Sequence, residues 1–373
     1  MKIFFVDPQS YNNLAVYDSS LLTNMEGVCV TYFCNELYQC PEVPGVTHRA
    51  VFRYSRCGNA LTKALSYSAS VGRIAVAALR QRPDAVHIQW FRLWLLDYLL
   101  VFFFRLLGIR VVYTAHNVLP HTVRRGDKFR YVRYYHAVNA IIVHAQRTKE
   151  ELVRMSGVAP DKVNVIRHGV LLSASDRTLV GQRTEQLRQA LGIQPGTVVF
   201  SCLGIQNAYK GTDLVVDVWS RSSVLQSSDC FLLVVGKNEN IDFSPLDGLK
   251  NVAVINRKVS DEDFDAYMAL SSVVLLPYRA ISQSGVLFTA VQAGTPVMVS
   301  DVGGLPEILS AGKVGWNIGE ASLESVGAML EHLARHPEEI DAVASDKEAF
   351  TAVRQAYDWA VIARQTRQVY AQP

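Results

Sequence analysis

The chain has 373 residues, of which 49% are hydrophobic and 19% charged. This length allows two domains with a core each, and the composition excludes a disordered chain. The net charge of +3 conceals two unlike halves: residues 1–170 hold 21 Lys and Arg against 11 Asp and Glu, and the remainder holds 16 against 23. A basic half indicates an anionic partner, and because no nucleic-acid recognition motif accompanies the charge, a phosphorylated acceptor or a membrane surface is favoured over nucleic acid.

The six cysteines include no Cys-x-x-Cys pair, which argues against a zinc site and against a secreted disulfide framework. The apolar run at residues 1–6 is too short for a signal peptide and is expected to be the first strand. We therefore expect a reduced, cytoplasmic protein.

The first half alternates apolar strands with helices. Strands are expected at 3–6, 28–33, 50–54, 85–89, 110–115, 140–144 and 163–166, and helices at 61–78, 90–107 and 148–156. This alternation predicts a parallel sheet, whose ligands bind at the carboxyl ends of the strands. The loop after the first strand contains Tyr11, Asn12 and Asn13 but no Gly-x-Gly-x-x-Gly fingerprint, so a dinucleotide-dependent dehydrogenase loses its main support.

The second half repeats the pattern. Strands are expected at 197–203, 231–236, 252–255, 273–276 and 297–300, and helices after Ser260, at 323–335 and at 338–357. The polar stretch 173–183 is the expected linker. We predict an N-terminal domain over residues 1–175, a second domain over 176–355 and a C-terminal helix over 356–373 that crosses back onto the first domain.

The stretch Leu275–Leu309 carries the strongest site signal. A short apolar strand leads into the small-residue turn 282–285, and a helix follows until Gly294. Small residues let a ligand approach the backbone, and the free N–H groups of a helix start favour an anion such as a diphosphate. A second glycine loop, residues 301–307, leads into a further helix.

This arrangement resembles the nucleotide-sugar site of GT-B glycosyltransferases of family 4, most specifically over residues 293–307. The resemblance implies an α/β chain with two Rossmann-like doubly wound parallel-sheet domains facing a cleft, the acceptor in the first and the donor in the second. In that family two glutamates eight positions apart flank the turn. Here Thr289 stands at the second position and Ser282 or Ile281 at the first, so a retaining or inverting outcome stays open.

The resemblance also implies roles for single residues. His116 lies in a segment similar to the motif whose histidine contacts the donor sugar, and Lys210 matches the lysine of the diphosphate motif. The arginine of that motif is replaced by Ile205 or Asn207, and Arg279 is a candidate substitute. The implied catalytic residues are His116 and Lys210, and the implied acceptor-binding residues are Tyr11, Asn12, Asn13, His116 and Asn117. The implied donor-binding residues are Gly204, Asn207, Lys210, Gly236, Arg257, Val259, Arg279, Ser282, Gln283, Ser284, Gly285, Val286 and Thr289.

We therefore expect a hexosyltransferase that moves a sugar from a UDP- or GDP-sugar to a glycan or a polyprenyl-diphosphate-linked acceptor, as in bacterial polysaccharide synthesis. The acidic stretch 261–265 is interpreted as the first turn of a helix after Ser260, and no Asp-x-Asp metal motif is found elsewhere, so a reaction without metal or other cofactor is expected. Two alternatives stay open: a non-catalytic nucleotide-sugar-binding partner subunit, and a GT-B epimerase. A phosphorylase is disfavoured because no lysine motif for pyridoxal phosphate is visible.

The segment 90–107 is strongly apolar and aromatic, and a basic cluster follows it. The cluster consists of His121, Arg124, Arg125, Lys128, Arg130 and Arg133. A membrane span is disfavoured, because both ends of the helix must return to one sheet and three charges would lie at membrane depth. Two interpretations stay open: a buried crossover helix, and a face that holds the protein peripherally on the anionic inner surface of a membrane.

Overall fold

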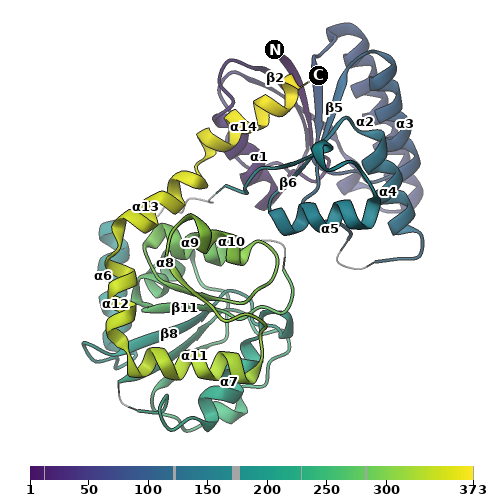
Figure 1. Ribbon diagram of the computed structural model, residues 1–373. Coiled ribbons are helices and arrows are strands. Elements are labelled where there is room, and N and C mark those ends of the chain that lie inside the picture. The colour runs from purple at the N-terminus through teal and green to yellow at the C-terminus, as the bar shows by residue number, and fades with distance from the viewer. Residues whose placement is uncertain (12, 121–122, 170–176, 228, 282–283, 373) are drawn as a thin grey trace. The chain divides into compact units, whose positions relative to one another are not determined.

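A computed structural model describes residues 1–373 except 12, 121–122, 170–176, 228, 282–283 and 373 (Figure 1). The chain divides into two compact units: unit 1 comprises Met1–Gly169 and Tyr357–Pro373, and unit 2 comprises Val170–Ala356. The domain boundaries predicted at residues 175 and 355 stay predictions, because the first falls next to residues outside this description.

The described strands of unit 1 form a seven-stranded parallel sheet in the order β3-β2-β1-β4-β5-β6-β7. They are β1 (Lys2–Val6), β2 (Cys29–Asn35), β3 (Val46–Phe52), β4 (Ala85–Ile88), β5 (Arg110–Thr114), β6 (Ala140–Val143) and β7 (Val163–Val165). The direction of strand addition reverses between β1 and β4. In doubly wound sheets this reversal marks the crevice where ligands bind, at the carboxyl ends of the strands.

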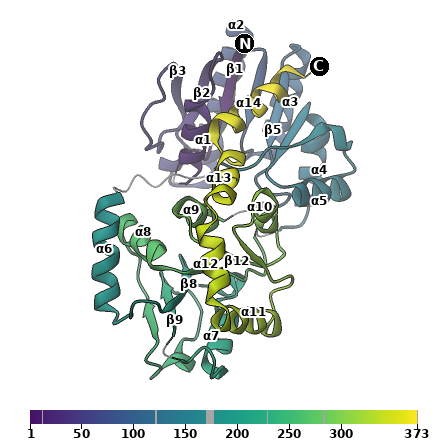
Figure 2. The same cartoon turned by 60° about the vertical axis from the view of Figure 1, so that its left-hand side comes forward.

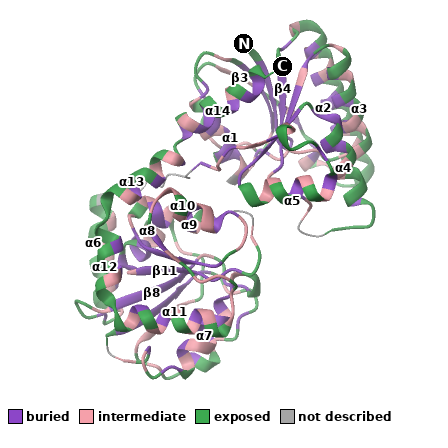
Figure 3. Cartoon of the chain, viewed as in Figure 1, coloured by how far each residue is buried: buried purple, intermediate pink, exposed green. Residues whose placement is uncertain are grey.

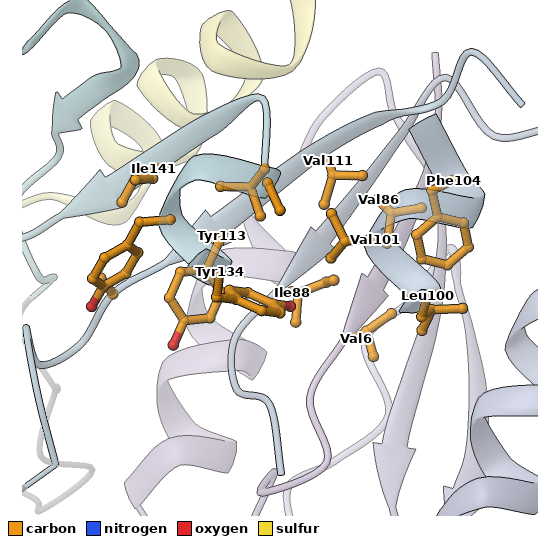
Figure 4. Close-up of a cluster of buried hydrophobic side chains, with 14 of the residues drawn as sticks. Val6, Val86, Ile88, Leu100, Val101, Phe104, Val111, Tyr113, Tyr134 and Ile141 are labelled. Atoms are coloured by element: carbon orange, nitrogen blue, oxygen red, sulfur yellow. The ribbon is translucent and has the colours of Figure 1, made fainter. Parts of the chain in front are cut away.

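Helices cover both faces of this sheet. They are α1 (Asn13–Thr23), α2 (Ala60–Gln81), α3 (Trp94–Leu106), α4 (Asp127–Ala137), α5 (Gln146–Ser156) and α14 (Trp359–Ala371), with 3₁₀ turns η1 (Tyr54–Arg56) and η2 (Pro160–Lys162). On one face, Ile88 of β4 and Tyr113 of β5 pack in one core with Phe104 of α3 and Tyr134 of α4 (Figure 4). Strand residues alternate between faces, so the intervening positions point to the other side, where α1 and α14 contact each other.

The described strands of unit 2 form a six-stranded parallel sheet in the order β10-β9-β8-β11-β12-β13. They are β8 (Val198–Leu203), β9 (Cys230–Val235), β10 (Val252–Ile255), β11 (Val273–Leu276), β12 (Val297–Val299) and β13 (Gly315–Asn317). Most strand residues are buried while the outer helix faces are exposed, as expected for a parallel sheet covered on both sides (Figure 3). Strand addition reverses between β8 and β11.

The helices of unit 2 flank this sheet on both faces. They are α6 (Arg177–Ala190), α7 (Thr212–Arg221), α8 (Asp261–Leu270), α9 (Gly285–Ala293), α10 (Leu305–Ala311), α11 (Leu323–Arg335), α12 (Pro337–Ser345) and α13 (Lys347–Ala356), with 3₁₀ turns η3 (Ala208–Lys210) and η4 (Ser244–Leu246). The buried faces of α7 and α11 share one core cluster with alternate residues of β8, β9 and β11.

Four expectations about local structure are wrong. The single helix expected over 338–357 is two helices, because Asp346 leaves the helical conformation (φ −76°, ψ 77°) and its carboxylate accepts the N–H of Ala349 at 2.9 Å. The expected linker 173–183 is helical from Arg177 onward, since α6 packs on α8 and Arg183 pairs with Asp263 at 2.7 Å.

The helix expected from residue 90 begins only at Trp94. The buried carboxylate of Asp97 accepts the N–H groups of Arg92 at 2.9 Å and Leu93 at 2.8 Å, which holds these residues in the turn before the helix. The strand expected at 50–54 lies earlier, at Val46–Phe52. The sequence pattern predicts neither α1, α4 nor α7.

Candidate functional site

Two glycines shape the carboxyl edge of the sheet in unit 2. Gly204 follows β8 with φ +90° and Gly236 follows β9 with φ +135°, conformations that side chains other than glycine rarely adopt. A Cβ on Gly236 would lie 1.9 Å from the carbonyl oxygen of Gly204. The two strand ends therefore touch through backbone alone, next to the reversal point of the sheet.

Gln206 holds the loop after β8 in place. Its buried amide nitrogen donates to the carbonyl oxygens of Gly204 at 2.6 Å and Val235 at 3.1 Å, and its amide oxygen accepts from the hydroxyl of Thr212 at 2.8 Å. This residue joins β8, β9 and the start of α7. Sequence reasoning missed it, because a glutamine in a loop carries no visible signal of burial.

Lys210 places a cation at this edge. Its Nζ lies 3.1 Å from the point where a Cβ on Gly204 would be, and 5.7 Å from the ring centroid of Tyr278. Burial lowers the pKa of the Lys210 ammonium. No hydrogen bond or ion pair engages Nζ within the residues that the structure describes. A half-buried cation without a counterion is costly, so an anionic ligand would stabilise this arrangement.

The other predicted cation of the site is already paired. The Arg279 guanidinium makes a bidentate ion pair with Asp213 on α7, at 2.7 and 2.6 Å, and also donates to the carbonyl oxygen of Ala208. Of the two residues that could replace the family's arginine, Ile205 is exposed and Asn207 donates to Glu239 at 3.2 Å. The buried Oδ1 of Asn207 has no partner among the described groups. A direct donor contact of Arg279 stays a prediction.

The start of α9 lies beside Gly204, since Val286 Cγ2 is 3.4 Å from the point where a Cβ on Gly204 would be. The buried hydroxyl of Ser284 caps the helix by accepting the N–H of Leu287 at 3.3 Å. A Cβ on Gly285 would meet nothing within 4 Å. The first N–H groups of α9 have no acceptor within the helix and are open to an anion.

The remaining predicted donor-binding residues lie on α9, in the turn before it and after β10. Thr289, at the position of a family glutamate, donates its hydroxyl to the carbonyl oxygen of Gly285 at 3.0 Å, within the helix. Ser282 and Gln283 lie outside the described residues. Arg257 is exposed with a distant ion pair to Asp263 at 3.9 Å, and Val259 is half-buried; both follow β10 at the same carboxyl edge.

In unit 1, His116 follows β5 at the carboxyl edge of the sheet. Its Nε2 lies 2.8 Å from the side-chain oxygen of Gln89, and its Nδ1 lies 3.2 Å from Nε2 of His144. The ring stacks on Trp90, with centroids 5.1 Å apart and planes at 9°, and meets Tyr17 edge-on at 5.1 Å. Both ring nitrogens are thus engaged within the protein, so its predicted contact with a donor sugar requires either the backbone or the opening of one hydrogen bond.

Sequence reasoning missed the histidines around His116. Burial lowers the pKa of His87 and of His144 to about 3, and it also lowers the pKa of His116 and of His168. These rings are therefore neutral at physiological pH. A signal does exist: polar residues recur at alternate positions of otherwise apolar strands, in Val86-His87-Ile88-Gln89 and in Tyr113-Thr114-Ala115-His116.

The predicted acceptor loop is only partly described. Tyr11 and Asn117 are half-buried, Asn12 lies outside the description, and Asn13 opens α1 without a described side chain. The carboxyl groups of the buried Asp7, directly after β1, and of Asp18 on α1 interact; burial raises the pKa of Asp7 to about 6 and also raises the pKa of Asp18. Because Oδ2 of Asp7 finds no donor among the described groups, the two carboxyl groups are best satisfied when they share one proton.

Helix α3 is neither wholly buried nor wholly exposed. Leu100, Val101 and Phe104 are buried, whereas one stripe of its surface is apolar and open. This stripe, called the α3 stripe below, consists of Leu95 (59% exposed), Leu99 (55%), Phe102 (50%) and Leu106 (78%). On the neighbouring α4, Phe129 is 58% exposed. In the part of the chain described, no helix is both long and apolar enough to cross a membrane.

Within the described ranges, no group of three or more His, Cys, Asp or Glu side chains is placed to hold a metal ion. The expected metal independence stays a prediction.

Comparison with known families matches both units. The family described as Glycosyltransferase Family 4 matches residues 24–173, and Glycosyl transferases group 1 matches residues 195–336, so together they cover more than half of the chain. A D-inositol 3-phosphate glycosyltransferase of Rhodococcus opacus is 24% identical over 260 residues, covering 64% of this chain and 57% of that protein. An uncharacterized glycosyltransferase of Methanocaldococcus jannaschii is 25% identical over 185 residues, covering 48% and 46%. The chain thus spans about half the length of the curated relatives it matches.

Solved structures match over the whole chain. HepE of Anabaena in complex with UDP has a TM-score of 0.70 at 15% identity and covers 100% of both chains. A glycosyltransferase of Rickettsia africae has a TM-score of 0.72 at 12% identity, covering 99% and 97%. At these identities the likeness shows the fold, and it confirms the predicted GT-B architecture. With both units matched and the fold shared, the chain belongs to family 4 of the GT-B glycosyltransferases.

Proposed function

We propose that the protein is a glycosyltransferase that moves a hexose-type sugar from a UDP- or GDP-sugar to a glycan or to a polyprenyl-diphosphate-linked acceptor. The observation that carries the proposal is the Lys210 ammonium, half-buried beside Gly204, which makes no hydrogen bond or ion pair among the described residues and has only the more distant charge of Glu239 near it. A nucleoside diphosphate supplies the missing negative charge. The sheet reversal next to β8 and β11 is where such folds bind nucleotides.

The chemistry requires stabilisation of a departing diphosphate. Lys210 would neutralise part of the charge that develops as the bond to the sugar breaks, and the N–H groups at the start of α9 would bind the phosphate oxygens. Gly204 and Gly285 leave room for the ligand to reach the backbone. In this proposal Arg279 acts indirectly, because its salt bridge to Asp213 fixes α7 against the loop after β11.

Two further properties belong to the proposal. The reaction uses neither a metal ion nor another cofactor, and its stereochemical outcome is left undefined by the absence of the glutamate pair. HepE has been solved with UDP, with UDP and glucose, and with UDP-glucose, which supports a uridine nucleotide and a hexose as the first donors to test.

Turnover of nucleotide sugars tests the proposal. Purified protein would first be screened by thermal stabilisation with UDP, GDP and their sugars, since a bound ligand raises the apparent stability by mass action. The preferred donor is then incubated with and without glycan or lipid-linked acceptors. Transfer that depends on an acceptor supports the proposal.

Two other outcomes would favour the alternatives. Conversion of the donor sugar without an acceptor would identify an epimerase. Tight binding of the donor without turnover, over a broad acceptor panel, would indicate a non-catalytic partner subunit.

We also propose that unit 1 docks peripherally on an anionic membrane, which brings it to a lipid-linked acceptor on the cytoplasmic face. The α3 stripe offers four exposed apolar side chains in one row, at spacings of four, three and four residues. The α3 and α4 surfaces are joined, since Trp94 Nε1 donates to the carbonyl oxygen of Arg130 at 3.1 Å. Exposed basic side chains lie on and before α4: Arg124, Arg125, Lys128, Arg130 and Arg133. An apolar row with basic neighbours fits an anionic lipid surface.

A further inference from the structure

Helices α1 and α14 lie over one face of the sheet of unit 1 (Figure 2). Polar side chains cross the sheet on this face. We call them the polar row: His87 on β4 and Gln89 after it, Thr114 on β5 and His116 after it, His144 after β6, and Tyr370 on α14. They stand at alternate positions of their strands, so they share one face. His87, Gln89 and Thr114 are fully buried, and His144 is 5% exposed.

Each member of the row lies within hydrogen-bond distance of the next. The atom pairs are Tyr370 Oη to His87 Nδ1 at 2.7 Å, His87 Nε2 to Gln89 Nε2 at 3.1 Å and to Thr114 Oγ1 at 2.7 Å, Gln89 Oε1 to His116 Nε2 at 2.8 Å, His116 Nδ1 to His144 Nε2 at 3.2 Å, and His144 Nδ1 to the carbonyl oxygen of Ile166 at 3.0 Å. The row thus runs from a hydroxyl at one end to a carbonyl at the other.

The carbonyl end fixes where the protons are. A carbonyl oxygen only accepts, so Nδ1 of His144 carries a proton and donates to Ile166. Burial keeps His144 neutral, so its Nε2 is an acceptor and must receive a proton from Nδ1 of His116. His116 is neutral for the same reason, which leaves its Nε2 as an acceptor that needs a donor.

Only the amide nitrogen of Gln89 can be that donor. The oxygen and nitrogen of a glutamine amide have nearly the same shape, so a half-turn of the amide puts N–H toward His116 Nε2 and oxygen toward His87 Nε2. His87 then donates from Nε2 and accepts the Tyr370 hydroxyl at Nδ1, and every proton has a matching acceptor. The Thr114 hydroxyl fits either way, because it can donate or accept.

The opposite amide orientation leaves a conflict. If Gln89 accepts from His116 Nε2, then His116 Nδ1 is an acceptor and His144 must donate from both nitrogens. His144 would be a buried cation. Burial disfavours such a charge, and Asp18 on the adjacent α1 accepts the hydroxyl of Tyr32 at 2.5 Å.

We propose that Gln89 is a positioning residue that donates its amide N–H to Nε2 of His116 and thereby fixes His116 as the Nδ1–H tautomer, with its ring held against Trp90. The groups that face His116 are His144, His168 and Tyr17, besides Gln89 and Trp90. The role in transfer rests on the proposed function, while the tautomer is a property of the free protein. Because α14 supplies Tyr370, the C-terminal helix is part of the polar row that fixes the tautomer of His116.

Nitrogen-15 NMR of the histidine rings in the free protein is the first test. We expect His116 protonated at Nδ1, His144 at Nδ1 and His87 at Nε2, unchanged between pH 5 and pH 8. Assignment comes from single His→Gln variants. A proton on Nε2 of His116, or a doubly protonated His144 in this range, would overturn the proposal.

A carboxylate in place of the amide is the second test. Gln89→Glu has the same shape but cannot donate when ionised, so we expect His116 to gain a proton on Nε2 and its pKa to rise. Gln81→Glu, at the end of α2 and outside the polar row, is the control with the same change of charge. A His116 spectrum that is identical in Gln89→Glu and wild type would contradict the proposal. Should Gln89→Glu fail to fold, Gln89→Met removes the donor without adding charge, and His116 is then expected to lose its single tautomer.

Kinetics separates positioning from a purely structural role. We expect Gln89→Glu to lower kcat about 2- to 10-fold, the range expected when one hydrogen bond is lost, with a smaller change in KM for the donor. An equal loss in Gln81→Glu would contradict it. If the NMR result is as proposed but no nucleotide sugar is turned over, the proposed function fails and the tautomer assignment stands.

Discussion

The two sheets place polar side chains at the same kind of edge and treat them in opposite ways. In unit 1 the ring nitrogens of His116 are bonded to Gln89 and His144, so the polar groups satisfy one another. In unit 2 the Lys210 ammonium and Oδ1 of Asn207 have no hydrogen-bond partner among the described residues. The hydrogen bonds of the His116 ring are complete without a ligand, although Oδ2 of Asp7 and Nε1 of Trp90 in the same unit lack a partner among the described residues. The Lys210 ammonium, by contrast, gains a direct partner only when an anionic ligand binds.

This difference separates two tasks. A charge that lacks a direct ion pair is stabilised most by an anionic ligand. Unit 2 is therefore expected to contribute most of the free energy of binding of the donor. The side chains around His116 are already hydrogen-bonded to one another and keep a fixed geometry when a neutral sugar binds. They are therefore expected to orient the sugar and to add little to its affinity. Unit 2 should therefore dominate binding energy, and unit 1 should affect turnover more than binding.

The largest effect is expected at the glycine contact of unit 2. Gly236→Ala forces a Cβ to within 1.9 Å of the Gly204 carbonyl oxygen at a φ of +135°. We therefore expect the free energy of unfolding, measured with urea, to fall by at least about 2 kcal/mol. Gly285→Ala is the matched change, because a Cβ there meets only open space. It should leave stability within about 0.5 kcal/mol but weaken nucleotide binding. Equal stability losses in both would contradict this account of the edge.

The second effect concerns the pH dependence of the free energy of unfolding of unit 1. Burial lowers the pKa of His87 and His144 to about 3, below the value of about 6.5 in an unfolded chain, so the unfolded state binds more protons between these values. Stability is therefore full above pH 6.5 and falls as the pH drops toward 3, by about 1.4 kcal/mol per pH unit for each ring. Burial also raises the pKa of Asp7 and of Asp97 to about 6, and that of Asp18, and these carboxyl groups act in the opposite direction from about pH 4 upward.

Variants isolate the histidine contribution. His144→Gln should flatten the dependence between pH 6.5 and pH 5, measured by urea unfolding at several pH values. His332→Gln on α11 is the control, since this side chain is exposed. An unchanged slope in His144→Gln would mean that the row is not held neutral by burial.

The smallest effect concerns the α3 stripe. Leu99→Ser should weaken co-sedimentation with anionic vesicles about fivefold, because about 1 kcal/mol of apolar burial is lost. Leu179→Ser on α6 of unit 2 is the control, since Leu179 is also 51% exposed. Lys128→Glu should reduce binding at low salt only. Equal recovery with neutral and anionic vesicles, or binding that salt does not release, would exclude an anionic lipid as the partner.

Much of the fold could be predicted from sequence, because buried parallel strands leave short apolar runs between glycine and proline signals. Of the helices that were missed, α4 mixes charged residues with tyrosines and depends on tertiary packing, with Trp94 bonded to the Arg130 carbonyl oxygen. Lys210 and Gly204 could be named from their motif. The pairing of Arg279 with Asp213 and the engagement of His116 could not, since both depend on contacts between segments distant in the chain.

The contact between Lys210 and the diphosphate of the donor is the central feature of the proposed site. The decisive measurement compares the affinities of UDP and uridine, or of GDP and guanosine if that base is preferred, for wild type and for Lys210→Ala by calorimetry. Lys250→Ala, an exposed lysine next to the amino end of β10, is the control.

A charge-assisted phosphate contact contributes about 1.5 to 3 kcal/mol, so the preference for the diphosphate should fall about 10- to 150-fold in Lys210→Ala, with nucleoside affinity unchanged. A folded Lys210→Ala that retains the full preference for the diphosphate would contradict the account.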